Sequence, residues 1–471
     1  MPLNLLAWYV LIFSVGVAST AVEITGLRFL APLFGSSLPV WGSAIATVLA
    51  GLAWGYSEGG RQAQTRTPLP LVFRYSVVGS VVFLWIPVAF RLVTYAQNVY
   101  LTSNNSVALI SAFGLSFLTL FVPSFIFGMI NPLAVQAQAT AREQAPGEVA
   151  GKIASLSTIG SLVGILLPSF LLIPLVGTNI TVWLCAAPAL LLGLRGFFKQ
   201  RRDTRLLVLL AVTLSTVFLP NRHESNVLFA AETRQQHVTV REHNGSRLLT
   251  FDASLGIQSL FTKNTYTHGY WDYLAAVPAF FASQDHLSVL VLGAAASTTE
   301  RQMHRLWQEA KTFDFTSVEI DSELFAIADR YFYPPARQTV VADARRFVAA
   351  DNHQYDLIII DVYERELSVP FHLTTVEFFE QLRPRLAPGG IVAININATD
   401  EQTLWVRSLA RTAAAIFPEV RLAAVPDSCN FLLLATTKSW PQATSALPLI
   451  QPLLPPLENA TRPDADGLLL T

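Results

Sequence analysis

The chain has 471 residues, of which 52% are hydrophobic and only 14% are charged, and its formal net charge is −1. Such a balance provides no basic surface of the kind that nucleic-acid binding needs, and the second half has no basic patch with interleaved aromatic residues. No nucleic-acid partner is therefore expected. The two cysteines, Cys185 and Cys429, say little about the redox compartment.

Apolar runs separated by short polar loops fill the first 220 positions. A helix needs about 20 mainly apolar residues to cross a hydrocarbon core of about 30 Å. Six runs are predicted to do so: Leu6–Ile24, Val40–Tyr56, Leu71–Phe90, Val107–Met129, Ser155–Leu175 and Thr178–Leu194. Residues 1–220 are thus predicted to form an α-helical transmembrane bundle. The first run has no basic stretch before it and leads into further spans, so we expect it to remain as a helix and not to be cleaved as a signal peptide.

A seventh apolar run, Leu206–Leu219, would reach only about 21 Å as a helix, and its status decides the topology. Six crossings would place the following domain on the side of the N-terminus, and seven would place it on the opposite side. Arginine and lysine favour the cytoplasmic side, and they gather in alternate loops: Arg61, Arg66 and Arg74; Arg142 and Lys152; Arg195, Lys199, Arg201, Arg202 and Arg205. These loops and the N-terminus are expected inside.

The composition becomes mixed from about Asn221, where a small β-subdomain is predicted over residues 221–285. Its hairpin signal is two alternating stretches, His237–His243 and Ser246–Phe251, around the turn Asn244-Gly245. Residues 286–440 then alternate strands with helical patterns, which predicts an α/β Rossmann-like domain built from right-handed βαβ units. Its predicted strands are Val289–Leu292, Val318–Ile320, Thr339–Val341, Leu357–Ile360 and Ile391–Ile394, followed by an antiparallel pair, Val420–Ala424 and Phe431–Ala435. Residues 441–471 are rich in proline and predict an irregular or disordered tail.

Several apolar strands end in glycine or an acid, and in such sheets ligands bind outside the carboxyl ends of the strands. Gly293 follows the first strand, and Glu319 closes the second, where a carboxylate can accept hydrogen bonds from both hydroxyls of a ribose. The alternative for Glu319 is a helix-capping or solvated acid. Asp343-Ala344 follows the third strand, where the acid can meet the exocyclic amine of adenine, cap the next helix, or do both.

Asp361 ends the fourth strand and begins a polar loop that contains Glu364. These carboxylates can hold a cationic amine and take a proton from it, and the alternative is a solvated acidic loop. Gln258 and the segment Tyr270-Trp271-Asp272 precede the sheet. The aromatic rings of that segment can flank a sulfonium cation or an amine, or they belong to the core while Asp272 caps a helix.

These positions, in this order, resemble the spermidine synthase family of polyamine aminopropyltransferases over about residues 232–438. The N-terminal half resembles the helical region of bacterial membrane-fused spermidine synthase-like proteins through residues 23–37. The resemblance implies a class I methyltransferase/spermidine synthase fold, and a multi-pass protein of the bacterial inner membrane. It also implies transfer of an aminopropyl group from decarboxylated S-adenosylmethionine to an amine, with release of methylthioadenosine and no metal. Because adenosine-type cosubstrates are supplied inside the cell, we favour a cytoplasmic domain.

The resemblance also implies roles for single residues. Glu319 would hold the ribose and Asp343 would face the adenine, while Asp361 and Glu364, beside Tyr270, would position and deprotonate the attacking amine. The remaining donor-site positions would be Gln258, Asp272, Gly293, Asp321 and Ala344. The chain departs from the family at Ala296, where the family has an acid that meets the amine end of the donor, at Trp271, which replaces a histidine, and at Glu364, which is one methylene longer than the family's second acid.

The acceptor implied is a small-molecule amine, such as a polyamine, or a lipid-borne amine presented by the helices in the bilayer; a homodimer is left open. Two other functions stay open. The loss of the acid at Ala296 favours an S-adenosylmethionine-dependent methyltransferase. Glu23 and Arg28, at the end of the first span, suit a transporter or sensor with a non-catalytic ligand-binding domain, unless they pair with each other at the membrane interface. Gly51–Gly55 and Gly160–Gly164 have a spacing that allows close helix packing.

Overall fold

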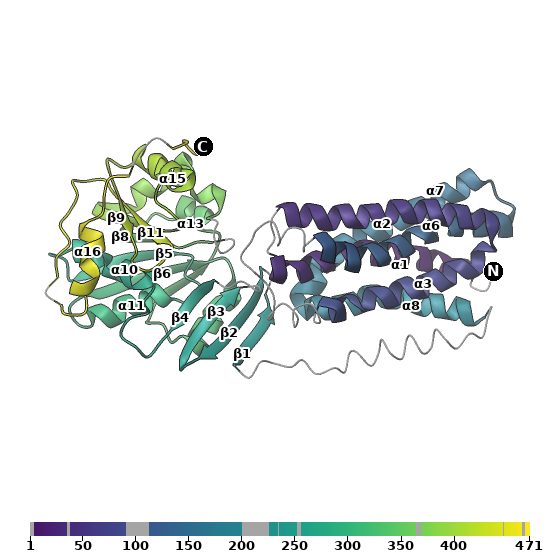
Figure 1. Cartoon of the computed structure of the whole chain (residues 1–471), viewed down its shortest axis with the longest axis horizontal. Helices are drawn as coiled ribbons and strands as arrows, with labels where there is room; N and C mark the ends of the chain where they lie inside the picture. Colours follow the sequence, from purple (N-terminus) through teal and green to yellow (C-terminus); the bar gives the residue numbers. More distant parts are fainter. Residues whose placement is uncertain are drawn as a thin grey trace. The chain divides into compact units, whose positions relative to one another are not determined.

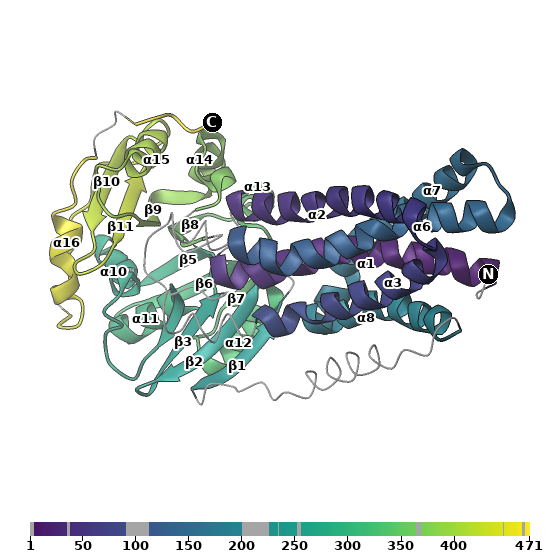
Figure 2. The ribbon, with the colours of Figure 1, turned by 45° about the vertical axis from the view of Figure 1, so that its right-hand side comes forward.

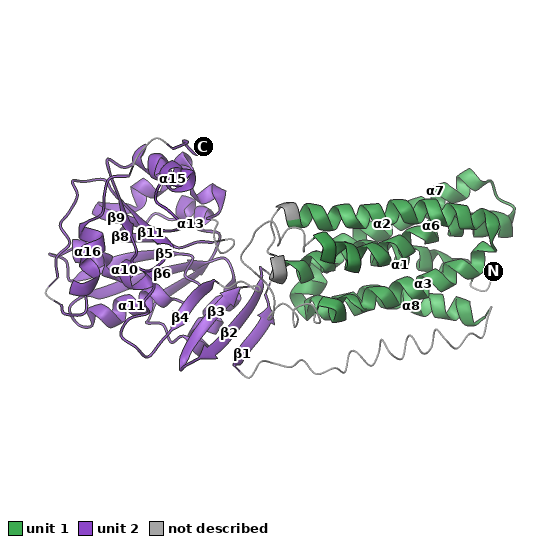
Figure 3. Cartoon of the chain, in the orientation of Figure 1, with its two compact units in different colours: residues 1–223 green, residues 224–471 purple. Residues whose placement is uncertain are grey.

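The computed structural model describes residues 4–34, 38–90, 113–199, 226–233, 235–251, 256–363, 369–445, 447–463 and 467–471. The chain divides into two compact units, residues 1–223 and residues 224–471 (Figure 3). Each unit has its own apolar core. The two units are described separately below.

Unit 1 is a bundle of long helices. Its elements are α1 (Leu5–Phe34), α2 (Leu38–Thr65), α3 (Pro68–Leu84), the π-helical turn η1 (Phe117–Phe121), α6 (Val122–Arg142), α7 (Pro146–Leu167), the π-helical turn η2 (Pro168–Leu172) and α8 (Ile173–Phe198). Among the described residues, four stretches are long and apolar enough to cross a membrane: Leu5–Ala31, Pro68–Phe90, Phe113–Arg142 and Pro146–Phe198. They are compatible with membrane spans, and crossing itself stays a prediction.

The last of these stretches has 53 residues and contains a break. Gly177, with φ 76° and ψ 166°, interrupts the helical backbone inside α8. The predicted runs Ser155–Leu175 and Thr178–Leu194 lie on the two sides of this break. The predicted span at residues 40–56 lies within the 28-residue α2, which is not one of these four stretches. The start of the run Val107–Met129 and the whole of Leu206–Leu219 lie outside the described residues.

Glycines bring pairs of helix backbones together in unit 1. A Cβ atom added to Gly160 of α7 would lie 2.2 Å from the carbonyl oxygen of Phe13 in α1. A Cβ atom added to Gly55 of α2 would lie 2.3 Å from the carbonyl oxygen of Phe125 in α6. The close packing expected from the glycine spacing is therefore present at these crossings, where a larger residue would separate the helices.

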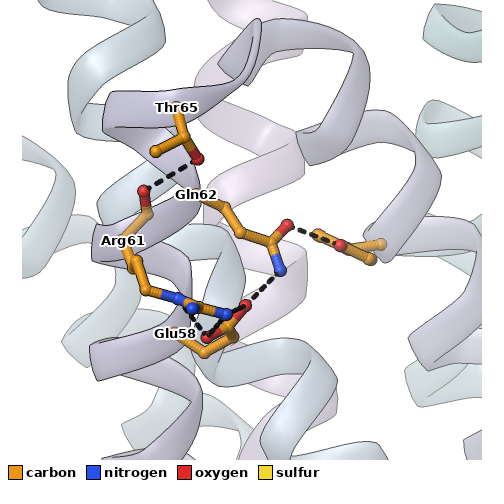
Figure 4. Close-up of polar contacts among 5 residues, drawn as sticks. Glu58, Arg61, Gln62 and Thr65 are labelled. Atoms are coloured by element: carbon orange, nitrogen blue, oxygen red, sulfur yellow. Dashed lines mark hydrogen bonds and ion pairs between the residues drawn. The ribbon is translucent and has the colours of Figure 1, made fainter.

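Polar side chains join the helices at the end of the bundle where α2 finishes and α3 begins. Figure 4 shows Glu58 bonded to Arg61 and Gln62 within α2. The hydroxyl of Tyr75 in α3 donates to Gln62 Oε1 at 2.7 Å, which links the two helices. The Glu58–Arg61 pair is exposed on its arginine side, so its contribution to stability is small.

Unit 2 begins with a four-stranded sheet in the order β1-β2-β3-β4, in which neighbouring strands are antiparallel. Its strands are β1 (Val227–Glu232), β2 (His237–His243), β3 (Ser246–Phe251) and β4 (Ile257–Phe261). The predicted hairpin is confirmed with the same bounds for β2 and β3. Its turn has positive φ at both Asn244 (50°) and Gly245 (75°), as a two-residue type I′ hairpin requires.

A seven-stranded sheet follows, in the order β10-β11-β9-β8-β5-β6-β7. Strand β11 is antiparallel to both of its neighbours, and the other pairings are parallel. The strands are β5 (His286–Leu292), β6 (Thr312–Glu319), β7 (Gln338–Val341), β8 (Tyr355–Ile360), β9 (Leu386–Asn397), β10 (Glu419–Ala424) and β11 (Asn430–Thr436). Every strand predicted in this region is present, including the antiparallel pair. This is the Rossmann-like arrangement expected.

Helices cover both faces of this sheet. The helices are α10 (Tyr270–Ala276), α11 (Thr298–Trp307), α12 (Ser322–Tyr331), α13 (Ala344–Ala350), α14 (Val376–Leu382) and α15 (Leu404–Ala414), with short 3₁₀ turns at Val277–Phe280, Phe371–Leu373 and Arg383–Arg385. Alternate residues of β8 enter two different cores, Leu357 and Ile359 with α11, and Ile358 and Ile360 with α14 and α15. Figure 1 shows α11 and α15 on opposite faces.

The tail is not disordered, so that alternative of the prediction is wrong. Residues after 441 include the 3₁₀ turn η6 (Gln451–Leu453) and the short helix α16 (Leu454–Glu458), which lies beside β10 (Figure 2). Leu454 and Leu457 are buried in the same core as α11, and Thr461 forms a β-bridge with Leu422. Proline prevents long regular elements here, but the leucines between the prolines still have apolar surface to bury.

Candidate active site

The strand order reverses between β5 and β8, which is where ligands bind in open α/β sheets. Gly293 follows β5 and Asp361 follows β8. Gly293 has φ +82°, and a Cβ atom added to it would lie 2.5 Å from the carbonyl oxygen of Asp361. Only glycine tolerates both conditions. The glycine therefore lets the two strand ends approach each other at the reversal point.

The loop Gly293–Ser297 connects β5 to α11 and contains two left-handed residues that are not glycine. Ala295 has φ 45° and Ser297 has φ 59°. Such conformations cost free energy and persist where neighbouring groups hold them. Ala295 N–H donates to Glu319 Oε2 at 3.0 Å, and Ala296 N–H donates to the Ser259 hydroxyl at 3.0 Å. The loop is thus fixed from β6 on one side and from β4 on the other.

Glu319 lies at the end of β6 and is only 8% exposed. Besides Ala295, the backbone N–H groups of Ile320 and Asp321 donate to Oε1 at 2.8 and 3.2 Å. Burial raises the pKa of Glu319, while these hydrogen bonds act in the opposite direction. Three of roughly four acceptor positions on the carboxylate are used by described backbone groups. Ribose binding by Glu319 stays a prediction that would use the remaining position.

Two predicted site acids cap helices. Asp321 accepts from Glu323 N–H at the start of α12, and Asp343 accepts from Arg346 N–H at 2.9 Å at the start of α13. The capping role foreseen for Asp343 is confirmed. Its second oxygen lies 3.1 Å from Nε2 of His372. Contact of Asp343 with adenine is untested, as is a donor-site role for Asp321 or for the buried Ala344 that follows Asp343.

The carboxylate of Asp361 is held by hydrogen bonds from two side chains. Its partly buried carboxylate accepts a hydrogen bond at Oδ2 from the Tyr270 hydroxyl, at 2.9 Å. It accepts another at Oδ1 from the side-chain amide of Asn395, at 2.8 Å. Burial raises the pKa of Asp361 to about 6, against the lowering effect of these two hydrogen bonds. A carboxyl group with a pKa close to neutrality is suited to proton transfer at physiological pH.

The two aromatic residues that begin α10 make different contacts. Tyr270 is partly exposed and reaches Asp361, while Trp271 is 6% exposed and its ring lies 4.4 Å from that of Tyr270. Asp272 is buried and accepts hydrogen bonds from Thr267 N–H, His268 N–H and the Gln302 side chain. Its carboxylate thus stabilises the turn before α10, and its part in donor binding stays a prediction.

Two predicted positions remain, Gln258 and Glu364. Gln258 lies on β4, next to the serine that holds the loop, and is partly buried. Glu364, the second acid expected beside Asp361, lies outside the described residues. The structure therefore brings together Gly293, Glu319, Asp361 and Tyr270 around one edge of the sheet.

Two polar residues near Asp361 were not identified from the sequence. Asn395 is the first polar residue after the apolar run Ile391–Ile394, the same kind of position that drew attention to the other strand ends. Glu300 is fully buried in the first turn of α11 and accepts from the Ser317 hydroxyl at 2.7 Å. Burial raises the pKa of Glu300. An acid in a first helical turn usually stabilises the helix from the surface, so no sequence pattern pointed to Glu300 as an interior residue.

Residues 267–434 match the family described as spermine/spermidine synthase domain. Unit 2 contains a spermidine synthase-like domain. A probable polyamine aminopropyl transferase of Bifidobacterium longum is 30% identical over 238 residues, which are 48% of this chain and 52% of that protein. This chain thus spans about half the length of that relative.

Similarity extends into the helical half in some relatives. The polyamine aminopropyltransferase 2 of Streptomyces coelicolor is 26% identical over 382 residues, or 70% of this chain and 68% of that protein. The alignment is longer than unit 2, so it includes part of unit 1. Among solved structures, a probable spermidine synthase from Corynebacterium glutamicum covers 50% of this chain and 88% of its own, with 21% identity and a TM-score of 0.42.

Proposed function

We propose that the protein is a membrane-anchored aminopropyltransferase that uses decarboxylated S-adenosylmethionine to alkylate an amine, either a polyamine or an amine carried by a lipid. The observation that carries this proposal is Asp361, a partly buried carboxylate held by Tyr270 and Asn395 at the reversal point of the sheet. The spermidine synthase-like domain and relatives named as polyamine aminopropyltransferases support it.

The reaction requires an uncharged amine nitrogen. Its lone pair attacks the propyl carbon bonded to the sulfonium, the new N–C bond forms, and the C–S bond breaks with its electron pair moving to sulfur. Methylthioadenosine leaves, and one proton is lost from the nitrogen. Asp361 is the acceptor of that proton in this proposal, because each of its oxygens retains a lone pair beside the hydrogen bond from Tyr270 or Asn395. Holding amine and donor in line supplies much of the remaining catalysis.

The donor would lie across the ends of β5, β6 and β7. Glu319 would accept from the ribose, and Asp343 would meet the adenine amine after giving up its contact with His372. The Gly293–Ser297 loop would approach the donor through its backbone. The helices of unit 1 would keep the enzyme in the membrane.

A binding titration of the detergent-solubilised full chain tests the donor site. We expect saturable binding of methylthioadenosine and of decarboxylated S-adenosylmethionine, and at least about a tenfold loss in Glu319→Ala, which is the effect of removing one hydrogen bond to a charged group. Asp314→Asn is the matched control, because Asp314 is exposed and lies near the start of the same strand. Equal binding by the intact protein and Glu319→Ala would remove Glu319 from the site.

The alanine at position 296 favours a second candidate function, that of an S-adenosylmethionine-dependent methyltransferase. The side chain at this position is apolar and 1% exposed, so it offers no acid to the amine end of a decarboxylated donor. Tighter binding of S-adenosylmethionine than of its decarboxylated form, together with methyl transfer to an amine, would establish this function in place of the first.

A further inference from the structure

Asp361 is the end of a chain of hydrogen-bonded side chains that crosses three strands. Asn430, the first residue of β11, donates from Nδ2 to Oδ1 of Asn395 on β9 at 2.9 Å. Asn395 in turn donates from Nδ2 to Oδ1 of Asp361 after β8 at 2.8 Å. Asn395 is 1% exposed. The route therefore runs from β11, the neighbour of the edge strand β10, toward the reversal point of the sheet, and its middle member is buried.

The backbone around both amides is fixed as well. The hydroxyl of Tyr363 donates to the Asn395 carbonyl at 2.8 Å. Asn430 N–H donates to the Ser428 hydroxyl at 3.1 Å, and the Asn430 carbonyl accepts from Val425 N–H at 3.0 Å. These contacts hold the backbone from which each side-chain amide projects.

The donor-to-acceptor direction of these hydrogen bonds decides which form of Asp361 they favour. An asparagine amide has a donor end and an acceptor end. Because Asn430 supplies a donor to Asn395 Oδ1, the NH₂ group of Asn395 is turned toward Asp361. An ionised carboxylate can only accept hydrogen bonds, so this orientation suits the ionised form. The reverse orientation would present a carbonyl oxygen to Asp361, which only the protonated acid can satisfy.

We infer that Asn395 and Asn430 are positioning residues that hold Asp361 in its ionised, proton-accepting form. Asn430 acts through Asn395 and does not itself contact Asp361 or the reacting atoms. The catalytic meaning of this inference rests on the proposed function, whereas the hydrogen-bond chain itself does not. The hydrogen-bond chain thus favours ionised Asp361 before the amine binds.

The other titratable groups that face Asp361 come from three elements. Tyr270 of α10 donates to Oδ2, Tyr363 bonds the Asn395 carbonyl, and the charge of buried Glu300 of α11 disfavours ionisation of Asp361. The pKa of Tyr270 and that of Tyr363 are well above the usual value, mainly because both hydroxyls are buried. A change at Asn430 leaves these groups in place, so its effect reports on the amide chain.

Asn430→Asp is the variant that should reverse the orientation of the Asn395 amide. The new carboxylate has no donor for Asn395 Oδ1 and would draw the NH₂ group of Asn395 toward itself, so the carbonyl end of Asn395 would face Asp361. Asn430→Leu removes the donor without adding charge and should have a smaller effect in the same direction. Cys429→Asp is the matched charge control, because Cys429 is the exposed neighbour of Asn430.

The first readout is the protonation of Asp361 followed by infrared difference spectroscopy of the solubilised full chain between pH 4.5 and 8. Asp361→Asn identifies the carboxyl band. We expect the midpoint of this band to rise by about one pH unit in Asn430→Asp, the size of losing one hydrogen bond to a charged group. Cys429→Asp should change it by less than about a third of a unit, since its charge is exposed to solvent. This readout needs no turnover.

The second readout is the pH profile of methylthioadenosine release. In Asn430→Asp the rate should fall about fivefold at pH 6 and change little at pH 8, as follows from moving an ionisation by one unit. A uniform loss at every pH would show a merely structural role for Asn430. An unchanged infrared midpoint in both Asn430 variants would overturn the inference, whereas a shifted midpoint without any turnover would retain the chain and reject the proposed function.

Discussion

At the scale of single residues, the activity of the site depends on the protonation state of Asp361. Its pKa of about 6 means that the ionised form dominates above this pH. Because the ionised form is the one that accepts a proton, the rate should rise with pH through about 6. Asp361→Asn cannot accept a proton and should lower turnover by at least about 100-fold, the lower range of general-base effects.

The same variant should leave donor binding almost unchanged, since Asp361 faces the amine in the proposal. A titration with methylthioadenosine checks this point, and a pH series of initial rates checks the ionisation. Full activity of Asp361→Asn at pH 7.5 would show that another group removes the proton.

Gly293 is the second residue on which the site depends. An alanine there would combine a left-handed backbone with a Cβ atom 2.5 Å from the Asp361 carbonyl oxygen, so we expect a loss of about 2 kcal/mol or more in stability and loss of donor binding. Gly245→Ala has a similar positive φ but nothing within 4 Å of the new Cβ. It should cost only about 1 kcal/mol. Chemical denaturation followed by tryptophan fluorescence compares the two; an equal effect would mean that the close approach of β5 and β8 is unimportant.

At the scale of elements, the tail belongs to the core of unit 2. Leu457 of α16 is fully buried, and Leu457→Ala should lower the free energy of unfolding by about 2–4 kcal/mol. Leu468 in the same tail is 61% exposed, so Leu468→Ala should change it by less than about 0.5 kcal/mol. The same denaturation experiment measures both. No difference between them would mean that α16 does not pack as described.

The α1–α7 crossing gives a matched test in unit 1. A Cβ atom on Gly160 meets backbone at 2.2 Å, whereas nothing lies within 4 Å of a Cβ atom on Gly151 of the same helix. Gly160→Ala should therefore destabilise the bundle by about 1–3 kcal/mol, and Gly151→Ala should be neutral or slightly stabilising because alanine favours helix. Thermal unfolding in detergent compares them, and equal behaviour would contradict this crossing.

Local patterns predicted most elements. Strands β2 and β3 and those of the seven-stranded sheet could be predicted because alternation and short apolar runs are encoded within each segment, and the turn Asn244-Gly245 defines its own hairpin; β1 and β4 were not predicted. The folded tail was not predicted, since its order comes from contacts with β10 and α10, which are distant in sequence. Asn395 follows an apolar run as the other site residues do, but only the order of β8 and β9 in the sheet shows that it meets Asp361. Asn430 looks like an ordinary strand residue until β11 is placed beside β9.

At the scale of the whole molecule, the helical unit should hold the chain in the membrane. Its described residues include four stretches long and apolar enough to cross. We expect the full chain to remain in the membrane fraction after alkaline carbonate treatment, which releases peripheral proteins, and to dissolve in detergent. Release by carbonate would reject the membrane-anchored part of the proposal and leave the chemistry of unit 2 untouched.

The central claim is that one carboxylate at the sheet's reversal point accepts a proton while an aminopropyl group moves to an amine. Its most direct test is the release of methylthioadenosine from decarboxylated S-adenosylmethionine by the solubilised full chain, with and without added diamines and aminolipids. The account predicts amine-dependent release that Asp361→Asn abolishes while still binding methylthioadenosine. An intact protein that binds the donor but releases no methylthioadenosine with any amine, or an Asp361→Asn variant as active as the parent, would contradict it.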